Sequence, residues 1–312
     1  YGDHRDLHLS LRRQRQMCIR DRLTLKDYKR IFTEDFASQI KKVYWCGSYG
    51  DSIASNTWVE CAYWLRFSGV QSMQLYTNGS ARKPDWWRGL AAIFNRTYDY
   101  VYFSIDGLED TNHLYRRNVK WDRLMNNVES FMSADGEAVW DFLIFKHNEH
   151  QVEQAETLSK KLGFTSFRKK YTTRWDDFNS DGDWIQRESI QVNDYKLEKV
   201  TKKTDAPGGY ITQKSKINDT FQTKKINCFS FYNDNSEIYL AANGDVSPCC
   251  WLGDLKIHEA KNIIKDYTKI NINHTSLEDI LEGEFFNELA NGIQGKKNAY
   301  RLQTCYHTCG VN

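Results

Sequence analysis

The chain has 312 residues, of which 27% are charged and only three are proline, and its formal net charge is +2. This length suits one large domain or two ordinary ones, and no stretch approaches the about 20 apolar residues that span a bilayer. Eight cysteines without a recognisable secretory signal indicate metal or redox chemistry rather than a disulfide framework, and they predict a cytoplasmic protein.

The first 22 residues differ in composition from the rest of the chain. They hold six arginines, three aspartates and no lysine, whereas lysine is common afterwards. Without them 37 basic and 38 acidic residues remain, a formal charge of −1, so the charge balance does not favour a nucleic-acid partner. The run SLRRQRQMCIRDR resembles translated sequencing-adapter sequence. We therefore interpret residues 1–22 as a non-native prefix rather than as a disordered basic arm.

Helical and strand patterns alternate from residue 23 onward. Amphipathic spacing predicts helices over 23–42, 53–68, from Pro84 onward, over 120–134 and over 151–164, the last closed by Gly163. Short apolar runs predict strands over 43–46, 73–76, 100–105, 139–145 and 166–172. Alternation of this kind with short connections indicates an α/β fold with parallel strands.

Polar turns follow four of the predicted strands. They read CGSYGD, TNGS, SIDG and FKHN. Glycine and asparagine are ordinary turn residues, so each turn alone is weak evidence for a site. An α/β barrel places its chemistry where its strands end, and four such turns on one rim predict a site and favour a barrel or partial barrel over an open sheet.

The second half of the chain changes character. Residues 176–226 are charged and polar, and we interpret them as a linker or an irregular insertion. A small module follows over 227–312, with a strand-like start at EIYLAANGDVSP and a helix near 276–291. The predicted organisation is thus a prefix, a barrel-like domain over 23–175, the linker, and this module.

The module holds five cysteines within 82 residues: Cys228, Cys249, Cys250, Cys305 and Cys309. The adjacent pair makes a poor disulfide, whereas C-x3-C spacing lets one turn present two thiolates. Zinc and iron–sulfur clusters both accept four cysteines. No C-x2-C knuckle typical of zinc ribbons occurs, so the spacing favours iron–sulfur, and the density of cysteines disfavours buried inert thiols.

The run Cys228-x15-Gly244-x4-Cys249 resembles the C-x(9–15)-G-x4-C signature of SPASM/twitch extensions on radical S-adenosylmethionine enzymes. Cys305-x3-Cys309 is similar to the closing part of that signature. The middle C-x2-C-x5-C portion is absent, which points to the shorter twitch version with one auxiliary [4Fe–4S] cluster. The resemblance implies Cys228, Cys249, Cys305 and Cys309 as ligands, with Cys250 a neighbour.

The same resemblance extends over residues 23–175. CGSYGD is similar to the family's turn for the amino group of S-adenosylmethionine, SIDG to its fourth-strand motif near the ribose and carboxylate, and FKHN to its polar turn after the fifth strand. The implied cosubstrate-binding residues are Gly47, Tyr49, Gly50, Asp51, Ser104, Asp106, Arg116 and Asn148. The implied fold is a partial TIM-type (β/α)6 barrel lacking its first strand, plus the small cysteine-rich module.

One departure from the family pattern is the missing C-x3-C-x2-C motif for the catalytic cluster. Before residue 228 the cysteines are Cys18, Cys46 and Cys61, and no two have that spacing. We therefore expect a fragment that does not itself cleave S-adenosylmethionine. For the intact parent the resemblance implies a second [4Fe–4S] cluster, an electron donor, and a 5′-deoxyadenosyl radical that takes hydrogen from a substrate, with a peptide or protein as our first expectation.

Two other classes of protein compete with this interpretation. The first is a non-enzymatic four-cysteine metal-binding protein, with zinc or an iron–sulfur cluster in a structural or docking role. The second is a metal-independent α/β-barrel enzyme, for which no nucleophile or acid–base pair stands out on the rim. For His147 and His150 we expect capping or solvent contact rather than a ligand role. No nucleic-acid or membrane partner is expected.

Overall fold

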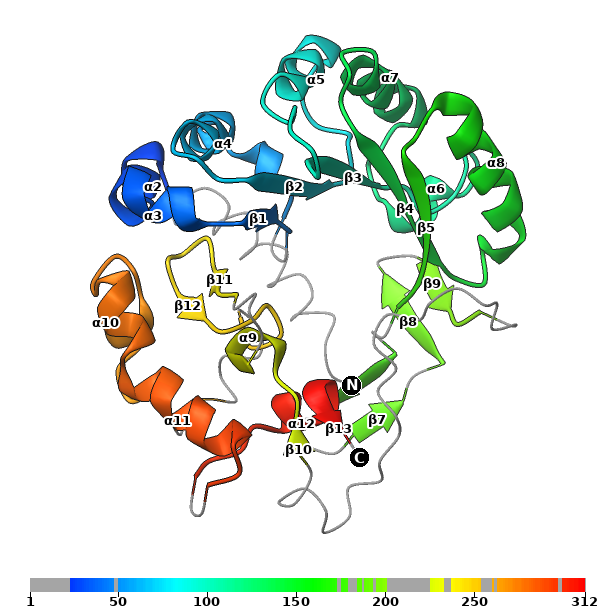
Figure 1. Cartoon of the computed structure of the whole chain (residues 1–312). Coiled ribbons are helices and arrows are strands. Elements are labelled where there is room, and N and C mark those ends of the chain that lie inside the picture. Colours follow the sequence, from blue (N-terminus) through cyan, green and yellow to red (C-terminus); the bar gives the residue numbers. More distant parts are fainter. Residues whose placement is uncertain are drawn as a thin grey trace. The chain divides into compact units, whose positions relative to one another are not determined.

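A computed structural model describes residues 23–47, 50–172, 175–178, 184–186, 188–192, 195–200, 225–232, 237–253, 260, 263–296 and 299–311. The chain divides into two compact units (Figure 1). One is Phe32–Tyr210, and the other combines Tyr1–Ile31 with Ile211–Asn312. Among the described residues, no helix has the length and apolar character needed to cross a membrane.

The Phe32–Tyr210 unit is built on a five-stranded parallel sheet. Its strands follow chain order: β1 (Lys42–Trp45), β2 (Ser72–Thr77), β3 (Tyr100–Ser104), β4 (Ala138–Ile144) and β5 (Ser166–Tyr171). The helices of this unit are α3 (Glu34–Gln39), α4 (Trp58–Phe67), α5 (Pro84–Ala91), the short α6 (Asn112–Tyr115), α7 (Trp121–Met132) and α8 (Val152–Leu162). The predicted α/β class with parallel strands is confirmed.

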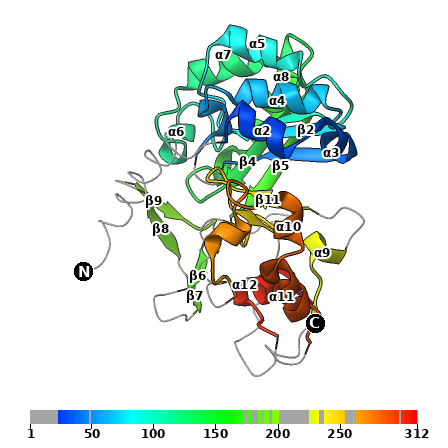
Figure 2. The ribbon, with the colours of Figure 1, turned by 90° about the vertical axis from the view of Figure 1, so that its left-hand side faces the viewer.

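The helices α4, α5, α7 and α8 lie on one face of this sheet (Figures 1 and 2). The strand residues that point to this face are large, apolar and buried: Met73, Leu75, Val101, Phe103, Trp140 and Phe142. The Trp87 ring of α5 lies 5.2 Å from that of Phe103. Each such side chain stabilises the fold by about 1.5–3 kcal/mol through removal of apolar surface from water. The opposite face carries polar and aromatic residues.

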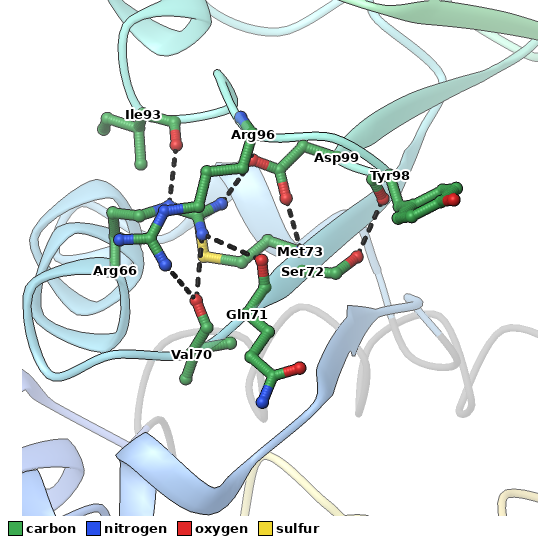
Figure 3. Close-up of polar contacts among 9 residues, drawn as sticks. All are labelled: Arg66, Val70, Gln71, Ser72, Met73, Ile93, Arg96, Tyr98 and Asp99. Atoms are coloured by element: carbon green, nitrogen blue, oxygen red, sulfur yellow. Dashed lines mark hydrogen bonds and ion pairs between the residues drawn. The ribbon is translucent and has the colours of Figure 1, made fainter.

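The N-terminal ends of the strands are held by a buried ion pair (Figure 3). Arg66, at the end of α4, pairs with Asp99, which directly precedes β3 and whose side chain is fully buried. The Asp99 carboxylate also accepts the backbone N–H groups of Met73 and Arg96, both at 2.8 Å. Arg66 and Arg96 both donate to the Val70 carbonyl, at 2.9 and 3.0 Å. The helix, the β2 entry and the β3 entry are thereby joined.

Three sequence predictions differ from the structure. The predicted helix 23–42 is two helices, α2 (Leu25–Ile31) and α3, because the Thr33 hydroxyl accepts the Phe36 N–H and so starts a new helix. The predicted helix near 276–291 is likewise two, α10 (Leu277–Leu281) and α11 (Glu284–Ile293), which meet at Gly283.

The third difference lies in the predicted irregular segment 176–226. It contains two short hairpins, β6 (Asp176–Phe178) with β7 (Trp184–Gln186) and β8 (Ser189–Val192) with β9 (Tyr195–Glu198). The second hairpin is attached to the end of β4, since the Lys146 N–H donates to the Glu198 carbonyl at 3.1 Å. Leu197 is buried beside Phe145 and Trp175 in a small apolar cluster. Residues 201–224 lie outside the described part.

The C-terminal unit combines short strands and helices. Two strand pairs, β10 (Lys225–Ile226) with β13 (Gly310–Val311) and β11 (Tyr239–Leu240) with β12 (Val246–Ser247), are antiparallel. The other elements of this unit are α2, α9 (Phe229–Tyr232), the 3-10 helix η5 (Tyr267–Ile270), α10, α11 and α12 (Gln303–Cys309). Buried apolar residues of α11, among them Phe285, Phe286 and Leu289, supply much of the core.

Candidate functional site

The turn after β1 is joined to the end of β2 through Asp51. Its Oδ2 accepts the Thr77 hydroxyl at 2.6 Å and the Asn78 N–H at 3.0 Å, while Oδ1 accepts the Ile53 N–H at 3.3 Å and caps the short 3-10 helix Ser52–Ala54. Burial raises the pKa of Asp51, although these hydrogen bonds and the positive charge of Arg116 oppose the increase. Asp51 therefore holds two of the predicted rim turns together.

Asp106 follows β3 and is buried beneath the rim. Its Oδ2 lies 2.5 Å from Nε of Arg116, and its Oδ1 accepts the Leu143 N–H at 2.6 Å. Burial raises the pKa of Asp106, and the charge of Arg116 opposes this. The Arg116 side chain is 27% exposed, whereas that of Asp106 is 1% exposed. The carboxylate thus orients the guanidinium, and the arginine is the more exposed side chain of the pair.

Asn148 is fully buried and serves as a link between two rim turns. Its amide group donates to the carbonyls of Asp106 and Leu143, both at 2.9 Å, and its Oδ1 accepts the Phe145 N–H at 2.7 Å. Both amide hydrogens are engaged by the backbone. Asn148 therefore fixes the turn after β4 against the turn after β3 and does not present these hydrogens to a ligand.

The remaining predicted rim residues that the structure describes are more exposed than Asp106 and Asn148. Gly47 and Gly50 are exposed in the turn after β1, and Ser104 is half-buried at the end of β3. Tyr49 lies outside the described residues. A Cβ on Gly47 would come 1.9 Å from the Gly50 carbonyl oxygen, so this turn requires glycine for its close backbone approach.

His147, next to Asn148, does not have the predicted capping or solvent role. Neither ring nitrogen has a hydrogen-bond partner among the described residues. The ring stacks on Phe145 at 5.4 Å and meets the edge of Tyr195 at 5.6 Å. Burial, and to a lesser extent the charge of His150, lowers the pKa of His147 to about 4. His147 is a neutral part of the contact between β9 and the rim.

The sequence analysis missed a group on the sheet face opposite the helices. We name it the tyrosine–cation cluster: Tyr76 of β2, Tyr102 of β3, Asp141 of β4, and Arg168 and Lys170 of β5. Tyr76 and Tyr102 are register partners whose rings stack at 4.4 Å. Asp141 and Arg168 are register partners as well. The three consecutive basic residues within SFRKKY were the available signal, but only the register shows which groups each of them meets.

In the C-terminal unit, α12 and the segment after β10 carry three of the predicted ligands, and the β10–β13 pair joins the two segments. Cys228 follows β10, and its neighbour Asn227 donates its N–H to the Cys309 carbonyl at 2.8 Å. Cys305 and Cys309 stand four residues apart in α12 and so share one helix face. Burial, with a smaller effect of Cys228, raises the pKa of Cys309 to about 11.

Cys249 is brought to the same module by the β11–β12 hairpin. The hairpin turn requires Gly244, which has a φ of +95°, and a Cβ there would lie 2.4 Å from Nδ2 of Asn273. Burial raises the pKa of Cys249 to about 12, with hydrogen bonds from the Leu252 and Trp251 backbone opposing the shift and Cys250 and Cys228 adding to it. Cys250, by contrast, is exposed.

The four predicted ligands thus come from the ends of β10, β12 and α12. Cys228 is near enough to Cys249 and to Cys309 to influence the pKa of each thiol. In the part of the chain that the structure describes, no three His, Cys, Asp or Glu side chains are already grouped closely enough to hold a metal ion. The donor set fits an iron–sulfur cluster in chemistry, and the sulfur atoms would have to close around it.

Comparisons with known proteins agree with this arrangement. Residues 228–310 match SPASM, an iron-sulfur cluster-binding domain. A search of curated proteins found no match. Among solved structures, Streptococcus suis SuiB bound to precursor peptide SuiA is 13% identical, with 91% of this chain and 69% of that chain covered and a TM-score of 0.51. Histidine-tagged anSMEcpe with bound AdoMet is 11% identical, with 84% and 69% covered and a TM-score of 0.50.

A further structure of Streptococcus suis SuiB is 13% identical, with 76% of this chain covered and a TM-score of 0.46. The chain spans 56% of the length of that protein. At these identities the solved structures establish a shared fold. Residues 228–310 are thus similar to an iron-sulfur cluster-binding SPASM domain, and the chain shares the fold of SuiB and of anSMEcpe.

Proposed function

We propose that the C-terminal unit binds one auxiliary [4Fe–4S] cluster through Cys228, Cys249, Cys305 and Cys309. The observation that carries this proposal is that the SPASM match contains all four cysteines, of which Cys228 influences the pKa of Cys249 and of Cys309. The thiols of Cys249 and Cys309 keep their protons at neutral pH in the absence of metal, so cluster binding releases protons. The binding free energy must also draw the sulfur atoms together, which couples loading to the folding of this unit.

The choice of Cys249 over Cys250 rests on burial and hydrogen bonding. Cys249 is the less exposed of the two and receives backbone hydrogen bonds from Trp251 and Leu252. Hydrogen bonds to ligand sulfurs and exclusion of solvent are the means by which proteins tune such clusters. Cys250 has the exposure of a surface residue beside the ligand.

For the rim, we propose a binding site for S-adenosylmethionine. Arg116 would attract its carboxylate, because it carries a positive charge and is the more exposed side chain of the pair with Asp106. Ser104 and the backbone of the Gly47–Tyr49–Gly50 turn would contact the remaining polar groups, while Asp51 and Asn148 hold the turns in place. The fold shared with anSMEcpe, whose structure contains bound AdoMet, supports this proposal.

For the whole protein, we propose a radical S-adenosylmethionine enzyme of the cytoplasm, with the domain boundaries predicted above and a partial barrel lacking its first strand. The 312 residues contain no C-x3-C-x2-C motif. When bound to a reduced catalytic cluster, S-adenosylmethionine supplies radical chemistry, and an electron donor would be the partner. Streptococcus suis SuiB, which shares the fold, was solved with its precursor peptide SuiA, and this supports a peptide substrate.

The decisive experiment is anaerobic reconstitution of the chain with iron and sulfide. We expect about four irons per chain and a broad brown absorbance, as four thiolates around one [4Fe–4S] cluster require. Cys228→Ala or Cys305→Ala should abolish loading, whereas Cys250→Ala is the matched control that retains it. Stoichiometric zinc with no iron uptake would instead favour the four-cysteine structural or docking protein. Loss of iron in Cys250→Ala to the same extent would show that the wrong member of the pair was assigned.

A further inference from the structure

The tyrosine–cation cluster contains more positive than negative charge. The Asp141 carboxylate accepts two hydrogen bonds from Arg168. Nε lies 2.5 Å from Oδ1, and Nη2 lies 2.7 Å from Oδ2. Lys170 places its Nζ 2.6 Å from the same Oδ2. Two cations thus share one carboxylate. A bidentate arginine alone would already satisfy that carboxylate, so the lysine charge is not needed to neutralise it.

The tyrosines do not supply a compensating negative charge. The Arg168 guanidinium lies over the Tyr102 ring at 3.9 Å, and Lys170 Nζ lies 5.6 Å from the centre of the Tyr76 ring. Burial raises the pKa of Tyr76 to about 12, so its hydroxyl stays neutral at physiological pH. The stacked rings therefore form a flat, partly dry support under the two cations, where an ionic contact is stronger than in open water.

The two cations remain within reach of a ligand, whereas the carboxylate does not. The side chains of Arg168 and Lys170 are 33% and 39% exposed, and that of Asp141 is 8% exposed. Lys170 has three N–H donors, of which Asp141 takes one. Arg168 has five N–H donors, of which two face Asp141 and one is hydrogen-bonded to Tyr76. An incoming carboxylate would meet donors and a net positive charge at this face.

We propose that the tyrosine–cation cluster binds an acidic side chain of the peptide substrate, with Lys170 as its principal contact. This inference rests on the proposed function, because it assigns a substrate class to the same sheet. The carboxylate of S-adenosylmethionine has the same chemistry as a glutamate side chain, and the experiment separates the two. Arg168 serves chiefly to position Asp141 and the tyrosine rings, since it makes the bidentate contact.

The test uses the full chain after reconstitution and two blocked peptides, Ac-Ala-Glu-Ala-NH2 and Ac-Ala-Gln-Ala-NH2. Affinities are measured by saturation-transfer NMR, and S-adenosylmethionine affinity by calorimetry. We expect the glutamate peptide to bind about tenfold more tightly than the glutamine peptide, which is the usual gain from one charge-assisted hydrogen bond. In Lys170→Gln that preference should disappear while S-adenosylmethionine affinity stays unchanged.

The matched control is Lys169→Gln, one residue away on β5 and on the opposite face, where Lys169 pairs with Glu156 at 2.7 Å. It should retain the full preference for glutamate. Equal affinities for the two peptides in the unmodified chain would overturn the proposal. So would a loss of S-adenosylmethionine affinity in Lys170→Gln with the peptide preference intact, because the face would then serve the cosubstrate. Failure of iron loading or of S-adenosylmethionine binding in the unmodified chain would instead count against the proposed function.

Discussion

Asp106 and Arg116 form an ion pair in which the arginine is the more exposed side chain. Removing the carboxylate in Asp106→Ala would leave the guanidinium without its partner and the Leu143 N–H without its acceptor. We expect the free energy of unfolding to fall by about 1–3 kcal/mol, the usual cost of leaving a hydrogen-bonding group without its partner.

The same variant should bind S-adenosylmethionine more weakly, because Arg116 loses the group that orients it. Chemical denaturation and calorimetry measure the two effects. Glu109→Ala, an exposed neighbour, is the control and should change neither. An unchanged denaturation midpoint in Asp106→Ala would show that the pair does not stabilise the rim.

A second prediction concerns Gly244. An alanine there would combine a φ of +95° with a Cβ only 2.4 Å from Asn273 Nδ2 and 2.9 Å from Asn271 Oδ1. Both asparagines hydrogen-bond to the hairpin turn, so Gly244→Ala should disturb the segment that carries Cys249. We expect a destabilisation of roughly 2–3 kcal/mol and reduced iron loading.

Gly295→Ala provides the control for backbone conformation alone. Gly295 has a φ of +70°, and a Cβ there would meet nothing within 4 Å. Gly295→Ala should lower the free energy of unfolding by only about 1 kcal/mol and leave iron loading intact. If the two variants behave alike in denaturation and in iron content, the close approach at Gly244 has no role of its own.

The third prediction is a loss of stability at mildly acid pH caused by His147. Its pKa is about 4 in the folded protein against an ordinary 6.5, so the unfolded chain binds a proton between these values that the folded chain does not. Stability therefore falls as the pH drops through this window, by about 1–2 kcal/mol between pH 7 and pH 5.

His147→Phe keeps the ring between Phe145 and Tyr195 but removes the titrating group, so it should remove this part of the pH dependence. His150→Gln, an exposed neighbour, should leave most of it. Urea denaturation at the two pH values measures the difference. An identical pH dependence in the unmodified chain and in His147→Phe would assign the acid sensitivity to other groups.

The fourth prediction compares two ion pairs. Asp99→Ala would leave Arg66 and two backbone N–H groups without their shared acceptor, and we expect a destabilisation of about 3–5 kcal/mol. Asp85→Ala removes the partner of Arg88. The side chains of Asp85 and Arg88 are 93% and 58% exposed, so no measurable change in stability is expected. Thermal denaturation of both variants measures the difference in stability. Equal melting temperatures of the two variants would show that the buried pair does not stabilise the fold.

The strands of the main sheet were predictable to within about two residues because their apolar runs are short and end in clear turns. Gly163 was predicted to close its helix, and it does so in the left-handed conformation with a φ of +91°. The gathering of four polar turns at one edge also followed from the parallel order. These features are local in sequence, or follow from one rule of topology.

What the sequence did not reveal depends on contacts between distant residues. Asp106 and Asn148 were predicted to face a ligand, but their side chains engage Arg116 and the backbone of neighbouring turns. The tyrosine–cation cluster was not predicted, because its members lie on four strands and meet only through register. Likewise, no spacing rule shows which of Cys249 and Cys250 is the less exposed.

The unlike faces of the sheet also bear on how β5 finds its place during folding. Phe167 packs against Trp140 and Phe142, while Arg168 lies on the other face beside Asp141. A slip of one residue would reverse every side chain of the strand and move Arg168 and Lys170 away from Asp141 to the face that packs against the helices. An unpaired buried charge costs several kcal/mol, which no misaligned set of hydrogen bonds would offset. The placement of Phe167 on one face of β5 and of Arg168 and Lys170 on the other therefore also selects a single register. Apolar substitutions at Arg168 and Lys170 would make pairing in a shifted register easier and so favour misfolding.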